Sequence, residues 1–277
     1  MGESITELIS SKVESKDFSL PVFSSVAMEI QEAIEKDASL AEIEVIILKD
    51  QSLAAETLRL ANSALFAGLA KQKTVQQALA RLGVKRVFNF VVLASQQQIF
   101  KAKDPFLNDL MQKLWEQATI CAKACQWVAK KSGYSEIAED AFLAGLLHDL
   151  GSMVVLKAFD EINAQDDMEE LTSDVVRDVI ESLHTEYGYK VMQTWELPPE
   201  YANVARDHHL EQCDPNNALL QIVRLVDAAC RKVGVGADEP QEMALEALEE
   251  ATLLGIKDVY LAELELELED SVDELAA

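Results

Sequence analysis

The stretch Ala141–Leu156 reads AFLAGLLHDLGSMVVL, and it places His148 and Asp149 side by side at the end of a strongly apolar helical run. Burying an ionised carboxylate among apolar side chains is unfavourable unless the group is paired, hydrogen-bonded or bound to a metal ion. Two interpretations follow. The pair can stabilise a helix C-terminus at Gly151 by hydrogen bonding, or it can belong to a metal site. Residue types alone favour the first interpretation, because a single His-Asp dipeptide is a weak signal.

The remaining histidines favour the second interpretation. The chain has four histidines, and His184, His208 and His209 all follow His148 in one downstream region where the sequence predicts helices. Packed helices of this length can direct all four imidazoles into one pocket. Imidazole together with carboxylate is a ligand set that borderline divalent metals accept. The sequence therefore predicts one site, intact or vestigial, that several helices share.

The composition predicts an all-α fold. The chain has 277 residues, of which 49% are hydrophobic, with only 10 glycines and 6 prolines. This length is enough for one large domain or two small ones. Ala, Leu and Glu dominate and strand-type alternation is rare, so helix is the expected structure. We expect a multi-helical bundle with an N-terminal helical lobe.

The net charge of −25 opposes two classes of partner. Nucleic-acid binding is driven by basic side chains that displace counterions, and anionic membrane surfaces also attract basic segments. From Asp238 to the C-terminus there are 14 acidic residues and one basic residue. A solvated acidic helical face is favoured there over an acidic interaction tail. We therefore expect neither nucleic acid nor a membrane as a partner.

Helix-breaking residues and changes in composition predict three segments. Asp104-Pro105 is the clearest interior boundary, so residues 1–104 are expected to form the N-terminal helical lobe. Residues 105–232 are expected to form a second helical lobe that carries the histidines. Residues 233–277 form an acidic C-terminal extension, whose leucines recur at three- and four-residue spacing and so favour helix over the strand that the local LELELE alternation also permits.

Cysteine usage and the absence of targeting signals predict a cytoplasmic protein. The four cysteines are Cys121, Cys125, Cys213 and Cys230, and the first two are four residues apart, which is not a CxxC spacing. Free thiols are expected. The first 20 residues show no secretory pattern, and no apolar run reaches the ~18 residues that a membrane span needs.

Several blocks of sequence, in a fixed order, resemble one known family. They are LPVFSSVAMEI from Leu20, LRLANSALF at Leu58–Phe66, QALARLGVKRV at Gln77–Val87, GLLHDLG at Gly145–Gly151, HTEYGYKVMQTWELP at His184–Pro198, and His208-His209. With these blocks the chain resembles the HDOD proteins, a divergent branch of the HD phosphohydrolase superfamily, from about Leu20 to Cys230. The resemblance implies an all-helical, HD-like fold and a role in bacterial intracellular signalling, with signalling proteins as partners.

The resemblance also implies a ligand set for one or two divalent metals such as Mn, Fe, Mg or Zn. The matching positions are His148, Asp149, His184, His208, His209 and Asp227. The first histidine of the family pattern follows a Trp on the long helix, and Gln117 occupies that place after Trp115. A Gln amide oxygen is a weaker ligand than a neutral imidazole, so a weak or vestigial site is expected.

Two further departures bear on function. Ser152 stands where related cyclic-di-nucleotide phosphodiesterases place a Lys, and Tyr187-Gly188-Tyr189 is only a partial match to their GYP motif. The favoured hypothesis is therefore a non-catalytic signalling module with a degenerate metal site. The alternative is a metal-dependent phosphohydrolase acting on a phosphate ester or cyclic nucleotide, for which Arg206 and Lys190 are the nearby basic candidates.

Overall fold

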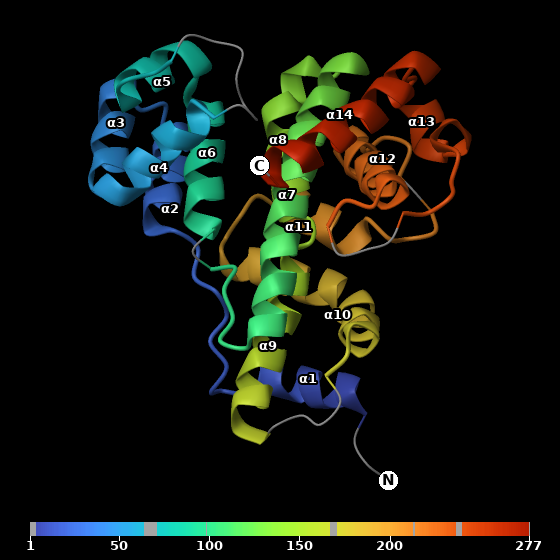
Figure 1. Cartoon of the computed structure of the whole chain (residues 1–277). Coiled ribbons are helices and arrows are strands. Elements are labelled where there is room, and N and C mark those ends of the chain that lie inside the picture. Colours follow the sequence, from blue (N-terminus) through green and yellow to red (C-terminus); the bar gives the residue numbers. More distant parts are fainter. Residues whose placement is uncertain are drawn as a thin grey trace. The chain divides into compact units, whose positions relative to one another are not determined.

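The described part of the chain is helical, with no strand (Figure 1). The structure is a computed structural model that describes residues 4–63, 71–97, 99–166, 171–212, 214–236 and 240–276. The all-α prediction is confirmed. The chain divides into two compact units. The first contains the N-terminal residues up to Pro21 together with Phe100–Leu275, and the second contains Val22–Ile99.

The first unit carries all the predicted ligand positions. Its elements are α1 (Ile5–Glu14), α7 (Pro105–Lys131), η2 (Ser135–Ile137), α8 (Ala138–Leu147), α9 (Leu150–Asp166), α10 (Ser173–Thr194), α11 (Pro199–Asp207), α12 (Ala218–Val233), η3 (Leu245–Ala247), α13 (Glu249–Leu253) and α14 (Asp258–Ala276). Asp104 begins α7, because its carboxylate accepts hydrogen bonds from the backbone of Phe106 and Leu107 and Pro105 occupies the first helical position.

The centre of the first unit is the helical stretch that contains the His-Asp pair. Eight of the ten residues of α8 are buried, on all sides of the helix, so α8 lies in the core and is not amphipathic. The sequence led us to expect no apolar run long enough to span a membrane. That expectation needs correction, since Ser135–Ala164 passes a test of length and apolar composition. However, 89% of the apolar window is buried inside the protein, as a core helix would be.

The predicted boundaries differ from the structure at the N-terminus. The sequence groups α1 with the residues up to 104, whereas in the structure α1 packs against α9 and α10. Ile9 is fully buried there, and Lys12 forms an ion pair of 2.9 Å with Glu161 on α9. The chain that follows α1 is also held, because the Trp195 indole N–H donates to the Pro21 carbonyl at 2.7 Å. These contacts join residues that are far apart in the sequence, so local boundary signals such as proline cannot reveal them.

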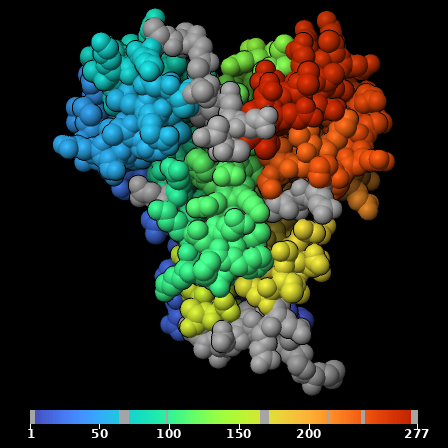
Figure 2. Space-filling model, in the orientation of Figure 1, coloured from blue at the N-terminus to red at the C-terminus, as the bar shows by residue number. Residues whose placement is uncertain are grey.

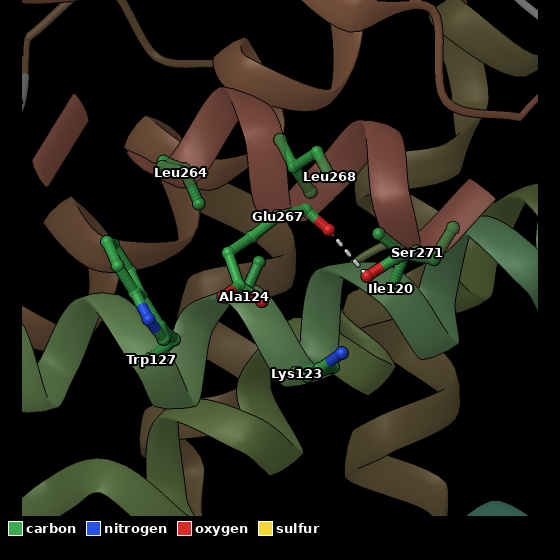
Figure 3. Close-up of a pocket in the computed structure, with 8 residues that line it drawn as sticks. All are labelled: Ile120, Lys123, Ala124, Trp127, Leu264, Glu267, Leu268 and Ser271. Atoms are coloured by element: carbon green, nitrogen blue, oxygen red, sulfur yellow. Dashed lines mark hydrogen bonds between the residues drawn. The ribbon is translucent and has the colours of Figure 1, made fainter. Parts of the chain in front are cut away.

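The C-terminal extension packs on the first unit as a helix. Figure 3 shows Leu264 and Leu268 of α14 facing Ile120 and Ala124 of α7. Lys131 at the end of α7 forms an ion pair of 2.9 Å with Glu263. The three- and four-residue leucine spacing thus describes this segment, and the strand alternative for LELELE is wrong.

The second unit is built around α6. Its helices are α2 (Ser25–Glu35), α3 (Leu40–Leu48), α4 (Gln51–Ala61), α5 (Val75–Leu82) and α6 (Val84–Gln96), and nine of the thirteen residues of α6 are buried. Asn62, a polar residue of the LRLANS block, ends α4: its amide donates to the carbonyls of Leu58 and Gln72 and accepts from the Gln72 N–H. Asn62 therefore has a capping role within this unit.

Two glycines allow α9 and α10 to cross at very short distance. A methyl group built at Gly151 would lie 1.8 Å from the backbone oxygen of His184 and 2.6 Å from the backbone nitrogen of Gly188. Backbone atoms cannot move aside as a flexible side chain can. The crossing therefore requires glycine at position 151 and brings the backbone of His184 directly against the segment that follows Asp149.

Gly151→Ala should destabilise the first unit strongly. We expect the free energy of unfolding to fall by about 3 kcal/mol or more, the upper end for overpacking of a rigid core. Chemical denaturation followed by circular dichroism measures the change.

Gly188→Ala is the matched control from the facing helix. Its methyl group would approach nothing closer than 3.3 Å, and the higher helix propensity of Ala offsets the crowding by about 1 kcal/mol. We expect stability close to wild type. Equal stability losses for the two variants would contradict the crossing described here.

Candidate metal centre

The His-Asp pair lies at the junction of two core helices. His148 is the residue that ends α8, Asp149 follows it, and α9 begins at Leu150. His148 is 1% exposed, whereas the Asp149 side chain is 21% exposed. His184 comes from the middle of α10 and His208 from the end of α11, and both are buried. Four helices thus deliver these side chains to one place.

Backbone carbonyls fix the orientation of the three buried imidazoles. The Nδ1 atoms lie 2.8 Å from Gly145 O for His148, 2.8 Å from Ile180 O for His184 and 2.9 Å from Ala205 O for His208. A carbonyl can only accept, so each Nδ1 carries the hydrogen. In a neutral ring, Nε2 is then left with a lone pair, which is the tautomer that ligates metal through Nε2.

The free Nε2 atoms converge on Asp149. His184 Nε2 and His208 Nε2 each lie 3.6 Å from Asp149 Oδ1, and His148 Nε2 lies 3.9 Å from Oδ2. The Nε2 atoms of His184 and His208 are 3.4 Å apart. These separations exceed ordinary hydrogen-bond lengths, and the facing atoms are acceptors. A cation between them satisfies all of these atoms at once, so the residues present fit a divalent metal ion.

Two overlapping groups of ligand atoms meet at His208. His148, Asp149 and His208 form one group, and His184, His208 and His209 form the other, with the ligand atoms of each group within 4.8 Å of one another. The His208 and His209 ring centroids are 4.1 Å apart. The structure therefore brings all four histidines together with Asp149, as the sequence predicted, although their role as metal ligands stays a prediction.

The local electrostatics keep this cluster in a ligating state near neutral pH. Burial by itself would raise the pKa of Asp149, but His148, His208 and His184 outweigh it and hold that pKa well below its usual value. Burial lowers the pKa of His208, and the neighbouring His148 lowers it further. His209 is exposed as a whole residue, but desolvation of its ring within the cluster, together with the adjacent imidazoles of His208 and His184, lowers its pKa to about 3. An ionised Asp149 beside His208 and His209, whose lowered pKa values favour the neutral ring, is the combination that metal binding requires.

Asp227 and Gln117, the other predicted positions, lie differently. Asp227 on α12 is buried and its carboxylate is 2.9 Å from Nη2 of Arg231, and it belongs to neither ligand group. Gln117 on α7 is 9% exposed. A methyl group at Gly236 would lie 2.4 Å from Gln117 Oε1, so the amide packs directly on that turn of backbone.

A hollow of about 230 Å³ opens beside Asp149. Gln117 and Ser152 also line it. Its cationic side chains are Lys113 and Arg177, which the sequence analysis did not identify. The predicted basic candidates do not line it: Arg206 pairs with Asp207, and Lys190 pairs with Glu186. For Lys113, the sequence offered one indication, the i,i+4 spacing from Asp109, which places both residues on the same face of the helix. The remaining lining residues are Phe106, Asp109, Leu110, Leu114, Leu156, Ser173, Val176 and Ile180.

A second missed residue supports the turn that carries His208 and His209. Arg224 on α12 donates through Nη1 to the backbone oxygens of His208 and Leu210, and its Nε donates to Glu250 on α13 at 2.5 Å. Both side chains of this ion pair are largely buried. Arg224 thus links the C-terminal segment to the end of α11.

The three described cysteines belong to neither ligand group. Cys121, Cys125 and Cys230 are buried and free, as predicted, and the sulfurs of Cys121 and Cys230 are 3.3 Å apart. Burial and the contact with Cys230 raise the pKa of Cys121 well above its usual value, so the thiol stays protonated. Cys213 lies outside the described residues.

The fold and the cluster define an all-helical protein with a candidate metal centre at a helix junction, and sequence comparison identifies the family. The HDOD domain profile matches residues 20–211. The chain belongs to the HDOD family. An uncharacterised protein of Treponema pallidum is 28% identical over 196 residues, which are 69% of this chain and 37% of that protein. The chain thus spans little more than a third of that relative.

Solved structures share the fold at low sequence identity. An HDOD domain protein of unknown function from Geobacter sulfurreducens has a TM-score of 0.75 at 21% identity, covering 97% of this chain and 95% of that one. A Shewanella amazonensis protein described as "putative metal-dependent phosphohydrolase" has a TM-score of 0.71 at 20% identity, covering 95% and 97%. These likenesses establish the fold.

His208 should contribute more to metal affinity than its neighbour in sequence. We expect His208→Ala to weaken Zn²⁺ binding by more than the about 10–100-fold typical of a lost supporting residue, because it removes an atom shared by both ligand groups. Isothermal titration calorimetry on protein prepared without chelators gives the affinities.

His209→Ala is the control, since His209 belongs to one group and is exposed. We expect it to retain most of the affinity. If both variants bind Zn²⁺ like the wild type, the cluster is not a metal centre.

Proposed function

We propose that the chain is a regulatory HDOD module whose His/Asp cluster binds a divalent metal weakly and does not hydrolyse phosphate esters. His148, Asp149, His184 and His208 would hold the ion, with His209 at the edge. Zn²⁺, Mn²⁺, Fe²⁺ and Mg²⁺ are all candidates, and a cluster of three imidazoles and one carboxylate favours the first three over Mg²⁺. The partners would be proteins of a bacterial cytoplasmic signalling pathway.

The observation that carries this proposal is Gln117. It occupies the place of the first family histidine, and its amide packs against the backbone at Gly236. The long helix α7 therefore supplies no imidazole to the cluster. An ion that loses one nitrogen ligand is bound less tightly, and its coordination is less defined, which weakens activation of a bound water molecule.

The hollow beside Asp149 offers little for a phosphate group. Its two cationic side chains already face carboxylates, with Lys113 3.0 Å from Asp109 and Arg177 3.7 Å from Asp174. Lys is the phosphate-binding residue at position 152 in the related phosphodiesterases, and Ser152 here is neutral and buried. A substrate phosphate would therefore lack a dedicated counter-charge apart from the metal itself.

The second candidate function is a metal-dependent phosphohydrolase. One observation favours it: Asp149 belongs to the ligand cluster and also lines the 230 Å³ hollow. When bound, a divalent ion would polarise a phosphate oxygen or activate water. This chain would then contribute the oriented imidazoles and the carboxylate that hold the ion next to the hollow.

Hydrolysis of bis(p-nitrophenyl) phosphate with added Mn²⁺ separates the two functions. We expect no turnover above the Asp149→Ala background in the wild type, because the site lacks both the α7 imidazole and a phosphate-binding cation. Turnover that Asp149→Ala abolishes would refute the regulatory proposal in favour of the enzyme.

Gln117→His provides the complementary test. Restoring an imidazole on α7 should increase Mn²⁺ or Zn²⁺ affinity by about tenfold or more, the scale of one added ligand interaction. Calorimetry measures the gain, and Gln126→His, on the same helix but bonded to Glu139, is the control. Unchanged affinity in Gln117→His would show that α7 does not face the metal position.

A further inference from the structure

One region of the chain has a charge opposite to that of the rest. Between Thr57 and Ile99 there are six basic residues and neither Asp nor Glu, whereas all 49 acidic residues lie elsewhere in a chain of net charge −25. Such segregation is unusual in a helical protein, where acidic and basic residues commonly alternate along exposed faces. The described cations of this region belong to the second unit.

Three of these cations line a hollow at α5. The hollow has a volume of about 390 Å³ and is lined by Lys71, Gln72, Lys73, Gln77, Ala80 and Arg81. Lys71, Lys73 and Arg81 are exposed, and none of the three forms an ion pair with a carboxylate in the described part of the chain. The lining residues other than the three cations are uncharged. We call this surface the α5 hollow.

The complementary surface is the exposed face of α14. Val259 and Leu266 are seven residues apart, so they lie on one face of the helix, and they are 57% and 61% exposed. Glu269 and Asp270 are exposed on the next turn. Figure 2 shows much of α14 (red) at the molecular surface. An exposed apolar pair flanked by carboxylates is suited to an uncharged floor with a cationic rim.

We propose that α14 of one copy of the chain docks in the α5 hollow of a second copy. Leu266 and Val259 lie over the uncharged floor, and Glu269 and Asp270 pair with the cations of the rim. The two surfaces are different, so the contact is head-to-tail and can add further copies.

The contact is weak and reversible. A helix of 19 residues is about 28 Å long and the eight residues of α5 span about 12 Å, so only part of α14 lies against α5. We expect a contact smaller than the roughly 800 Å² per partner of a stable interface. The net charge of each copy opposes association at long range. At physiological ionic strength this repulsion is screened beyond about 8 Å. Ion pairs between the carboxylates of α14 and the cations of the α5 hollow then determine whether two copies associate.

Sedimentation velocity of the full chain, over a range of concentrations at physiological salt, tests the proposal. We expect the weight-average sedimentation coefficient of the wild type to rise with concentration. Arg81→Glu should abolish the rise, because it places a carboxylate at the rim. Lys16→Glu is the control: Lys16 is an exposed residue of the first unit, and its reversal changes the net charge by the same amount without touching either surface.

A charge exchange identifies α14 as the occupant. A variant with Glu269→Lys and Asp270→Lys should not self-associate, but an equimolar mixture with Arg81→Glu should regain association. A wild type that stays monomeric throughout overturns the proposal, as does Arg81→Glu associating like Lys16→Glu. Binding of single-stranded DNA that Arg81→Glu abolishes, without any change in sedimentation of the wild type alone, assigns the α5 hollow to a nucleic acid and also overturns it.

Discussion

The crossing of α9 and α10 at Gly151 sets the geometry of the candidate site. A side chain at this position would collide with the backbone of His184, so only glycine allows the two helices to approach. The approach places His184 beside the segment that begins with Asp149. His148 and Asp149 are already adjacent in the chain, and α11 adds His208. Backbone carbonyls then orient each buried imidazole, and the metal-binding capacity of the cluster follows from that orientation.

The burial of this cluster explains its electrostatics. Burial lowers the pKa of His208, while the pKa of Asp149 beside it lies well below its usual value. An ionised carboxylate next to imidazole lone pairs suits a cation and is not easily satisfied by water. Two features of the surroundings bear on whether such a cluster could act on a phosphate ester. Gln117 supplies no imidazole from α7, and the cations beside the hollow face carboxylates. The proposal of a regulatory module rests on this combination: a His/Asp cluster that could hold a metal, without a cation free to bind a phosphate.

Much of the fold and of the candidate site could be predicted because both leave local signals. Helix caps such as Asp104, the leucine spacing of α14 and the small number of histidines are all visible in the printed sequence. The position of α1 was not visible, because α1 packs on α9 and α10, and Lys12 pairs with Glu161, 149 residues away in the sequence. Arg224 was missed for the same reason: its partners lie on α11 and α13, and an arginine within an amphipathic helix carries no local mark of that role.

The sequence by itself determined which residues can form a site, because residue type and helical spacing are local properties. It identified His148, Asp149, His184, His208 and His209 as candidates, and the family resemblance added Asp227 and marked Gln117 as the departure. The tertiary structure alone decided which of them share one centre and that Asp227 pairs with Arg231 instead of joining a ligand group. The reason is physical: convergence depends on distances between helices, and those distances are set by close contacts such as the one at Gly151, where a single methyl group changes what can pack.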